Sequence, residues 1–100
     1  MPTRKLQPVH PGEILRLDFM TPLGISAYRL SKETGVSAQH LGRILKGTRG
    51  ITADVALRLG RFFGTSAQVW IGLQGRYDLD MAQDRAGREI ERRVRPFRAA

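Results

Sequence analysis

The 100-residue sequence predicts a small all-α domain, and three observations support this prediction. Apolar residues recur at intervals of three and four in several segments, which is typical of helices that bury one face. Ser or Thr residues precede these segments and Gly residues follow most of them, as N-caps and C-terminal stops do. No segment gives a convincing strand pattern. The length suits one compact domain with its own core.

The N-terminal quarter predicts a loose arm followed by one helix. Residues 1–9 hold two prolines and no periodicity, so we interpret them as a flexible arm. The helix begins at Pro11, because the missing N–H of proline would be unpaired at the first helical position in any case. Pro22 and Gly24 end it. Its expected apolar side consists of Ile14, Leu15, Leu17 and Phe19.

Residues 26–47 predict two short helices joined by a tight turn, the outline of a helix-turn-helix. Ser26 and Ser37 are the expected N-caps, and Gly35 provides the left-handed residue at the turn. Ser31 is small enough to let the two helices approach each other closely. On spacing alone, an ordinary helical hairpin in a small bundle remains an alternative.

The rest of the chain predicts three more helices. The fourth follows Thr52 and stops at Gly64, and the fifth begins at a capping box formed by Thr65 and Gln68. We interpret Trp70 and Tyr77 in the fifth helix as core rather than as a binding platform. A sixth, amphipathic helix is expected from Asp78 onward, with an apolar stripe of Leu79, Ala82, Ala86, Ile90 and Val94. The predicted organisation is an arm (1–9), a domain (10–77) and a C-terminal helix and tail (78–100).

Charge points to a polyanionic partner. The chain has 17 Lys and Arg residues against 9 Asp and Glu, a net charge of +8, and its pI is near 11.3. Residues 26–65 hold seven basic and two acidic residues, so five of the eight net positive charges coincide with the helix-turn-helix region. Nucleic acid is therefore the first partner to consider.

The third helix carries the residues best placed to read bases. If it enters the major groove N-terminus first, Ser37, Ala38, Gln39 and Arg43 are the expected base-reading residues. Gln39 can bind adenine through two hydrogen bonds and Arg43 can bind guanine in the same way. The alternative is that Gln39 and Arg43 are only solvated surface. The expected phosphate contacts lie at helix ends and in the adjacent loop: Ser26, Arg29, Lys46, Thr48 and Arg49.

Other functional classes find little support in the residues. There is no cysteine, and His10 and His40 stand thirty positions apart, so we expect no metal site and no cofactor. No phosphate-binding loop or nucleophile motif is present, and we expect a protein that is not an enzyme. No apolar run is long enough for a signal peptide or a membrane span, which predicts a soluble, cytoplasmic protein without a membrane partner.

Three blocks around the helix-turn-helix motif resemble a known family. They are HPGEIL at residues 10–15, ITADVALRLGRFFGTSAQVW at 51–70 and RYDL at 76–79, together with residues 26–30. With these blocks the chain resembles the HigA-type antitoxins, a branch of the XRE (lambda-repressor-like) helix-turn-helix regulators, over nearly its whole length. The resemblance implies a lambda-repressor-like five-helix domain with an additional C-terminal helix.

The same resemblance implies a homodimer that binds a palindromic operator in its own promoter and neutralises a HigB-type toxin, a RelE-fold ribonuclease. A stand-alone XRE repressor without a toxin and a basic protein-binding adaptor are the alternatives. The C-terminal segment has two candidate uses. Its carboxylates could contact a basic toxin (Asp78, Asp80, Asp84, Glu89 and Glu91), or its apolar stripe could form the dimer.

Overall fold

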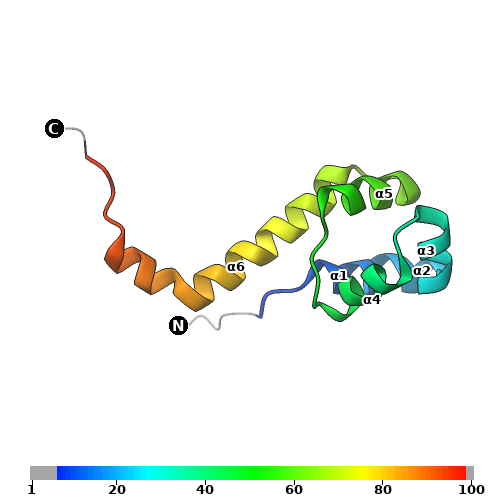
Figure 1. The fold of residues 1–100 in the computed structure, drawn as a ribbon, viewed down its shortest axis with the longest axis horizontal. Coiled ribbons are helices and arrows are strands. Elements are labelled where there is room, and N and C mark those ends of the chain that lie inside the picture. The colour runs from blue at the N-terminus through cyan, green and yellow to red at the C-terminus, as the bar shows by residue number, and fades with distance from the viewer. Residues whose placement is uncertain (1–6, 99–100) are drawn as a thin grey trace.

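The computed structural model describes residues 7–98, and within them every regular element is helical (Figure 1). The predicted all-α class is therefore confirmed. Residues 1–6 of the predicted arm, including Arg4 and Lys5, lie outside the described residues. The elements are α1 (Pro11–Ile14), η1 (Leu15–Met20), α2 (Thr21–Leu23), α3 (Ala27–Thr34), α4 (Ala38–Lys46), α5 (Ala53–Phe63) and α6 (Ala67–Arg93).

The first predicted helix is continuous but changes its spacing in the middle. Pro11 occupies its first turn, as expected, and Gly24 ends it with a φ of 67°. Between these ends, η1 has π-helical spacing, and the Thr21 N–H donates to the Arg16 carbonyl five residues back. The wider turn shifts the side chains that follow it around the helix axis. Met20 is buried as a result, whereas Leu17, which we predicted to be core, is 46% exposed.

The helix-turn-helix consists of α3 and α4 and follows the predicted chemistry. The Ser26 hydroxyl accepts from the Arg29 N–H and the Ser37 hydroxyl accepts from the His40 N–H. Gly35 has a φ of 80°, in the left-handed region that glycine adopts most readily. In the turn, the Ser31 hydroxyl donates to the Val36 carbonyl at 2.6 Å, so its small polar side chain also links the two helices.

The core lies where α1, η1, α3, α4, α5 and the first turns of α6 meet. Its fully buried side chains include Leu15, Leu30, Leu41, Ile44 and Leu59. Trp70 is also fully buried and packs beside Phe19 and Phe63, which confirms its assignment to the core. The two helices of the motif are thus anchored through their inward faces, and their outward faces remain available.

The predicted start of the fifth helix is wrong by one residue. Ser66, rather than Thr65, caps α6, because the Ser66 hydroxyl accepts from the Val69 N–H. The Thr65 hydroxyl accepts instead from the Trp70 indole N–H at 2.9 Å. A buried indole needs such a partner, and Thr65 meets that need in place of capping the helix.

The predicted break between a fifth and a sixth helix is also absent. Helix α6 runs without interruption from Ala67 to Arg93. Its first turns pack on α5, and its second half extends away from the rest of the molecule (Figure 1). There its apolar residues are uncovered: Leu79 is 67% exposed and Ile90 is 52% exposed.

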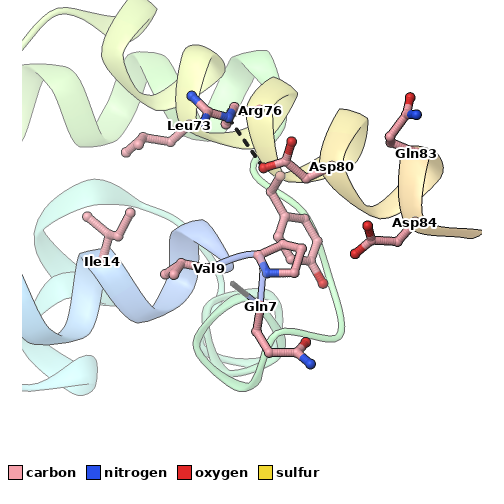
Figure 2. Close-up of a pocket in the computed structure, with 10 residues that line it drawn as sticks. Gln7, Val9, Ile14, Leu73, Arg76, Asp80, Gln83 and Asp84 are labelled. Carbon is pink, nitrogen blue, oxygen red and sulfur yellow. Dashed lines mark hydrogen bonds and ion pairs between the residues drawn. The ribbon is translucent and has the colours of Figure 1, made fainter. Parts of the chain in front are cut away.

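A groove separates residues 7–9 from α6 (Figure 2). Its volume is about 470 Å³, and Val9 and Ile14 face Leu73 and Asp80 across it. The Asp80 carboxylate pairs with Arg76 on the same helix.

No helix within residues 7–98 has the length and apolar character needed to cross a membrane.

Candidate nucleic-acid interface

The predicted base-reading residues are exposed along α4, from its N-cap to its last turn. Ser37 caps the helix, and Ala38, Gln39 and Arg43 follow it, all exposed. Leu41 and Ile44, on the opposite side of the same helix, are fully buried. The sequence therefore fixes which side of α4 faces outward, and all four predicted residues are accessible from solvent.

The side chains of Gln39 and Arg43 have unused hydrogen-bonding capacity. Neither makes a hydrogen bond or an ion pair with any residue in the described part of the chain. This distinguishes Arg43 from Arg58 and Arg76, which pair with Asp54 and Asp80 at 2.9 and 3.3 Å. An arginine fork without a partner on a helix face can form two parallel hydrogen bonds to a guanine edge.

The predicted phosphate contacts surround this surface but differ in their availability. Lys46 and Arg49 are exposed, and Ser26 marks the N-terminus of α3, where free backbone N–H groups favour anions. Arg29 forms an exposed pair with Glu33 at 3.5 Å, which is weak enough to exchange for a phosphate. The Thr48 hydroxyl donates to the Arg43 carbonyl at 3.2 Å, so it cannot donate to a phosphate while that bond is formed.

Arg58, a residue that we did not single out from the sequence, braces the turn between α3 and α4. Its Nη1 donates to the Thr34 carbonyl at 2.9 Å, across 24 positions of sequence, and its Nε donates to Asp54. A Cβ on Gly35 would lie 2.7 Å from the same Nη1. Helix α5 thus holds the end of α3 and restricts the turn from outside.

We expect Arg58→Ala to lower the free energy of unfolding by about 1 kcal/mol, because the Thr34 carbonyl loses its donor in a half-exposed position. Urea denaturation of both proteins measures the difference. Arg61→Ala is the matched control, since Arg61 lies on the same helix, is exposed, and forms no ion pair within residues 7–98. An equal loss in both variants would contradict the bracing role.

The described residues contain no group of side chains that could hold a metal ion. Within residues 7–98, no three His, Cys, Asp or Glu side chains are close enough together to hold a metal ion. Asp78 accepts from the Gln74 amide, Asp80 pairs with Arg76, and Glu89 pairs with Arg92 and Arg93. These carboxylates are therefore engaged within α6 itself.

Comparison with known proteins identifies the family. A helix-turn-helix family model matches residues 18–70, more than half of the chain. Antitoxin HigA-1 of Vibrio cholerae is 32% identical over 75 residues, which are 75% of this chain and 70% of that protein. The chain belongs to the HigA-type branch of the XRE helix-turn-helix proteins.

Two further similarities extend over this HigA-type chain. Virulence-associated protein I of Dichelobacter nodosus is 51% identical over 75% of the chain and 69% of its own length. The solved structure of Pseudomonas aeruginosa antitoxin HigA with the higBA promoter superposes with a TM-score of 0.87 at 45% identity, over 91% of this chain and 99% of that one. The resemblance seen in the sequence is thereby confirmed.

The structure of this HigA-type chain adds residues that sequence reasoning missed. Tyr28 is 71% exposed on the outward face of α3, and the Lys32 ammonium lies 5.5 Å from its ring. The sequence could have indicated Tyr28, because it is an aromatic residue between Ser26 and Arg29, two predicted phosphate contacts. Gly12 was seen only as part of a helix start, although α1 approaches α4 closely at that point.

Proposed function

We propose that the chain is the antitoxin of a type II toxin–antitoxin module. In this proposal it acts in the cytoplasm as a homodimeric autorepressor of its own promoter and neutralises a HigB/RelE-like ribonuclease. It is a binding protein and not an enzyme. The observation that carries the proposal is the outward face of α4, where the Gln39 and Arg43 side chains have no partner within residues 7–98. This face belongs to a fold that Pseudomonas aeruginosa HigA, solved with the higBA promoter, shares over nearly its whole length.

Direct support for DNA binding comes from charge and geometry together. The candidate base-reading residues are exposed along α4, from its N-cap Ser37 to Arg43 in its last turn. The exposed cations Lys46 and Arg49 lie at its C-terminal end, and Ser26 marks the N-terminus of the neighbouring α3. This arrangement allows phosphate contacts to set the orientation of α4 while Gln39 and Arg43 read base edges.

We assign dimerisation to the second half of α6. At 100° per residue, Leu79, Ala82, Ala86 and Ile90 fall within about 80° of one another, roughly opposite Trp70 and Tyr77, which face the core. Gly72 and Gly75 continue this stripe, and a Cβ at either would contact nothing. A second copy that covers this face would join two recognition helices, as a palindromic operator requires.

We expect Ala86→Glu to convert the dimer to a monomer, because it places a carboxylate in the middle of the apolar stripe. Light scattering after size exclusion should then give a molar mass near 11.2 kDa instead of twice that value. Arg88→Gln is the control, since it changes the net charge by the same amount on the opposite side of α6. A dimeric Ala86→Glu protein would exclude this face as the interface.

Co-expression with the small adjacent reading frame tests the toxin-binding half of the proposal. A basic partner should co-purify and lose its toxicity. Growth arrest despite co-expression, with no complex recovered, would favour the stand-alone repressor. Truncation after Tyr77 then tests the alternative use of the C-terminal carboxylates: toxin binding that survives the truncation excludes Asp78, Asp80, Asp84, Glu89 and Glu91 as the required contacts.

A further inference from the structure

The imidazole ring of His10 connects the N-terminus of α1 to the loop that follows the recognition helix. Its Nδ1 accepts from the Gly12 N–H at 2.9 Å and so caps α1. The ring also packs on Gly47, because a Cβ at Gly47 would lie 3.7–3.9 Å from three atoms of the His10 side chain. His10, Gly47 and Arg49 line the same hollow in the surface.

Helix α6 packs against the His10 ring on the side not covered by α1 and the loop. The Tyr77 ring meets His10 edge-on, with 4.8 Å between ring centroids and 69° between ring planes. Tyr77 and Asp78 from α6 and Arg49 from the loop are the titratable and charged groups that surround His10. Glu13 on α1 and Lys46 at the end of α4 are exposed. His10 therefore contacts three parts of the chain, including the loop predicted to hold the DNA backbone.

The hydrogen bond from Gly12 requires one protonation state of the ring. Nδ1 can accept from Gly12 only while it carries a lone pair, which places the single proton of the neutral ring on Nε2. A proton on Nδ1 would make that atom a donor, so that two N–H groups would face each other and the hydrogen bond from Gly12 would be lost. Burial lowers the pKa of His10 below 6.5, whereas the Arg49 backbone and Asp78 act in the opposite direction.

We propose that His10 is a positioning residue for DNA binding: its neutral ring holds residues 47–50 where Arg49 and the α4 C-terminus meet the phosphate backbone. This inference rests on the proposed function. Protonation breaks the hydrogen bond from the Gly12 N–H, and the ring must turn to separate the two N–H groups. The turned ring no longer packs on Gly47, so the loop is freed and operator affinity falls on acidification. The direction of this change in affinity is diagnostic, because the added positive charge of a protonated histidine would by itself tighten binding to DNA.

The pH range follows from the direction of the pKa change. Because the folded-state pKa lies below that of the unfolded chain, the ring stays neutral in the folded protein above about pH 6.5. Below that value the unfolded chain takes up its proton first, so both stability and loop order decrease as the pH falls through the folded-state pKa.

The test uses a background in which His10 is the only histidine. His40→Gln removes the other histidine of the chain, and His40→Gln/His10→Asn then retains a side-chain oxygen that can cap α1 but has no ring to titrate. Fluorescence anisotropy gives the Kd for a duplex of the chain's own promoter between pH 8 and pH 5.5 at constant ionic strength. A shuffled duplex is measured in parallel.

We expect the His40→Gln protein to bind its promoter about fivefold more weakly at the acidic end, the equivalent of losing one capping interaction. The double variant should lack this loss and should bind more weakly at pH 8. Superimposable pH profiles, or tighter binding of His40→Gln at low pH, would overturn the proposal.

NMR of the free His40→Gln protein separates failure of this inference from failure of the proposed function. The amide resonances of Thr48 and Arg49 should shift with the same midpoint as the His10 ring, below 6.5, whether or not the protein binds its promoter. Amide resonances that do not shift as the ring titrates would overturn the positioning role even if operator binding is intact. The measurement does not depend on the folding of the double variant.

Discussion

Gly12→Ala is expected to lower the free energy of unfolding by about 3 kcal/mol, at the upper end of overpacking effects. The reason is the contact between α1 and the recognition helix, where a Cβ on Gly12 would overlap the backbone oxygen of Ile44. A backbone atom cannot rotate away as a flexible side chain can. The two helices must therefore separate, and the inward face of α4, with Leu41 and Ile44, loses part of its packing.

Gly42→Ala provides the matched control for this substitution. Gly42 lies within α4, and a Cβ there would contact nothing within 4 Å. Alanine should stabilise that helix by about 0.5 to 1 kcal/mol relative to glycine. Urea denaturation of the two variants should thus give changes of opposite sign. A Gly12→Ala protein as stable as the parent would show that α1 and α4 are not packed as described.

Arg43→Ala should lose most of its selectivity for the correct base pair at one position in each half-site of the promoter. A two-bond contact between arginine and guanine contributes about 1 to 3 kcal/mol of discrimination, so selectivity at that position should fall about 5- to 150-fold. Within residues 7–98 the Arg43 guanidinium has no hydrogen-bond or ion-pair partner, which strengthens this expectation because the side chain needs no rearrangement to bind. Competition binding with duplexes that vary one position at a time measures the effect.

Arg49→Ala is the companion variant, because Arg49 carries the same charge in the loop beyond α4. It should weaken all duplexes to a similar extent and reduce the slope of log K against log salt by about one unit. An equal loss of selectivity in both variants would show that the reading face has been assigned incorrectly.

Features set by neighbouring residues could be predicted well from the sequence. Ser26, Ser37 and Thr52 all cap the helices expected of them, because an N-cap needs only its own hydroxyl and an N–H three residues later. Gly35 and Gly64 adopt the left-handed conformation at the expected helix ends for the same local reason. The outward face of α4 followed from the position of Leu41 and Ile44.

Features set by distant contacts could not be predicted in this way. Thr65 and Ser66 are both good caps, and the choice between them depends on the Trp70 indole, which takes the Thr65 hydroxyl. At Leu79 the apolar pattern changes from the core-facing side of α6 to the opposite side, and this change resembled a helix boundary. The requirement for a residue without a side chain at position 12 depends on the backbone of Ile44, 32 positions away.

We expect α4 of a dimer to read DNA in the promoter of the chain's own gene. Anisotropy titration of the unaltered protein on that promoter and on a shuffled duplex, at increasing salt, tests it most directly. We predict that binding to both duplexes weakens with salt while a large preference for the promoter persists, with two half-sites about 34 Å apart or at a multiple of that distance. Equal affinity for both duplexes at every salt concentration would contradict the claim and favour a basic protein-binding adaptor.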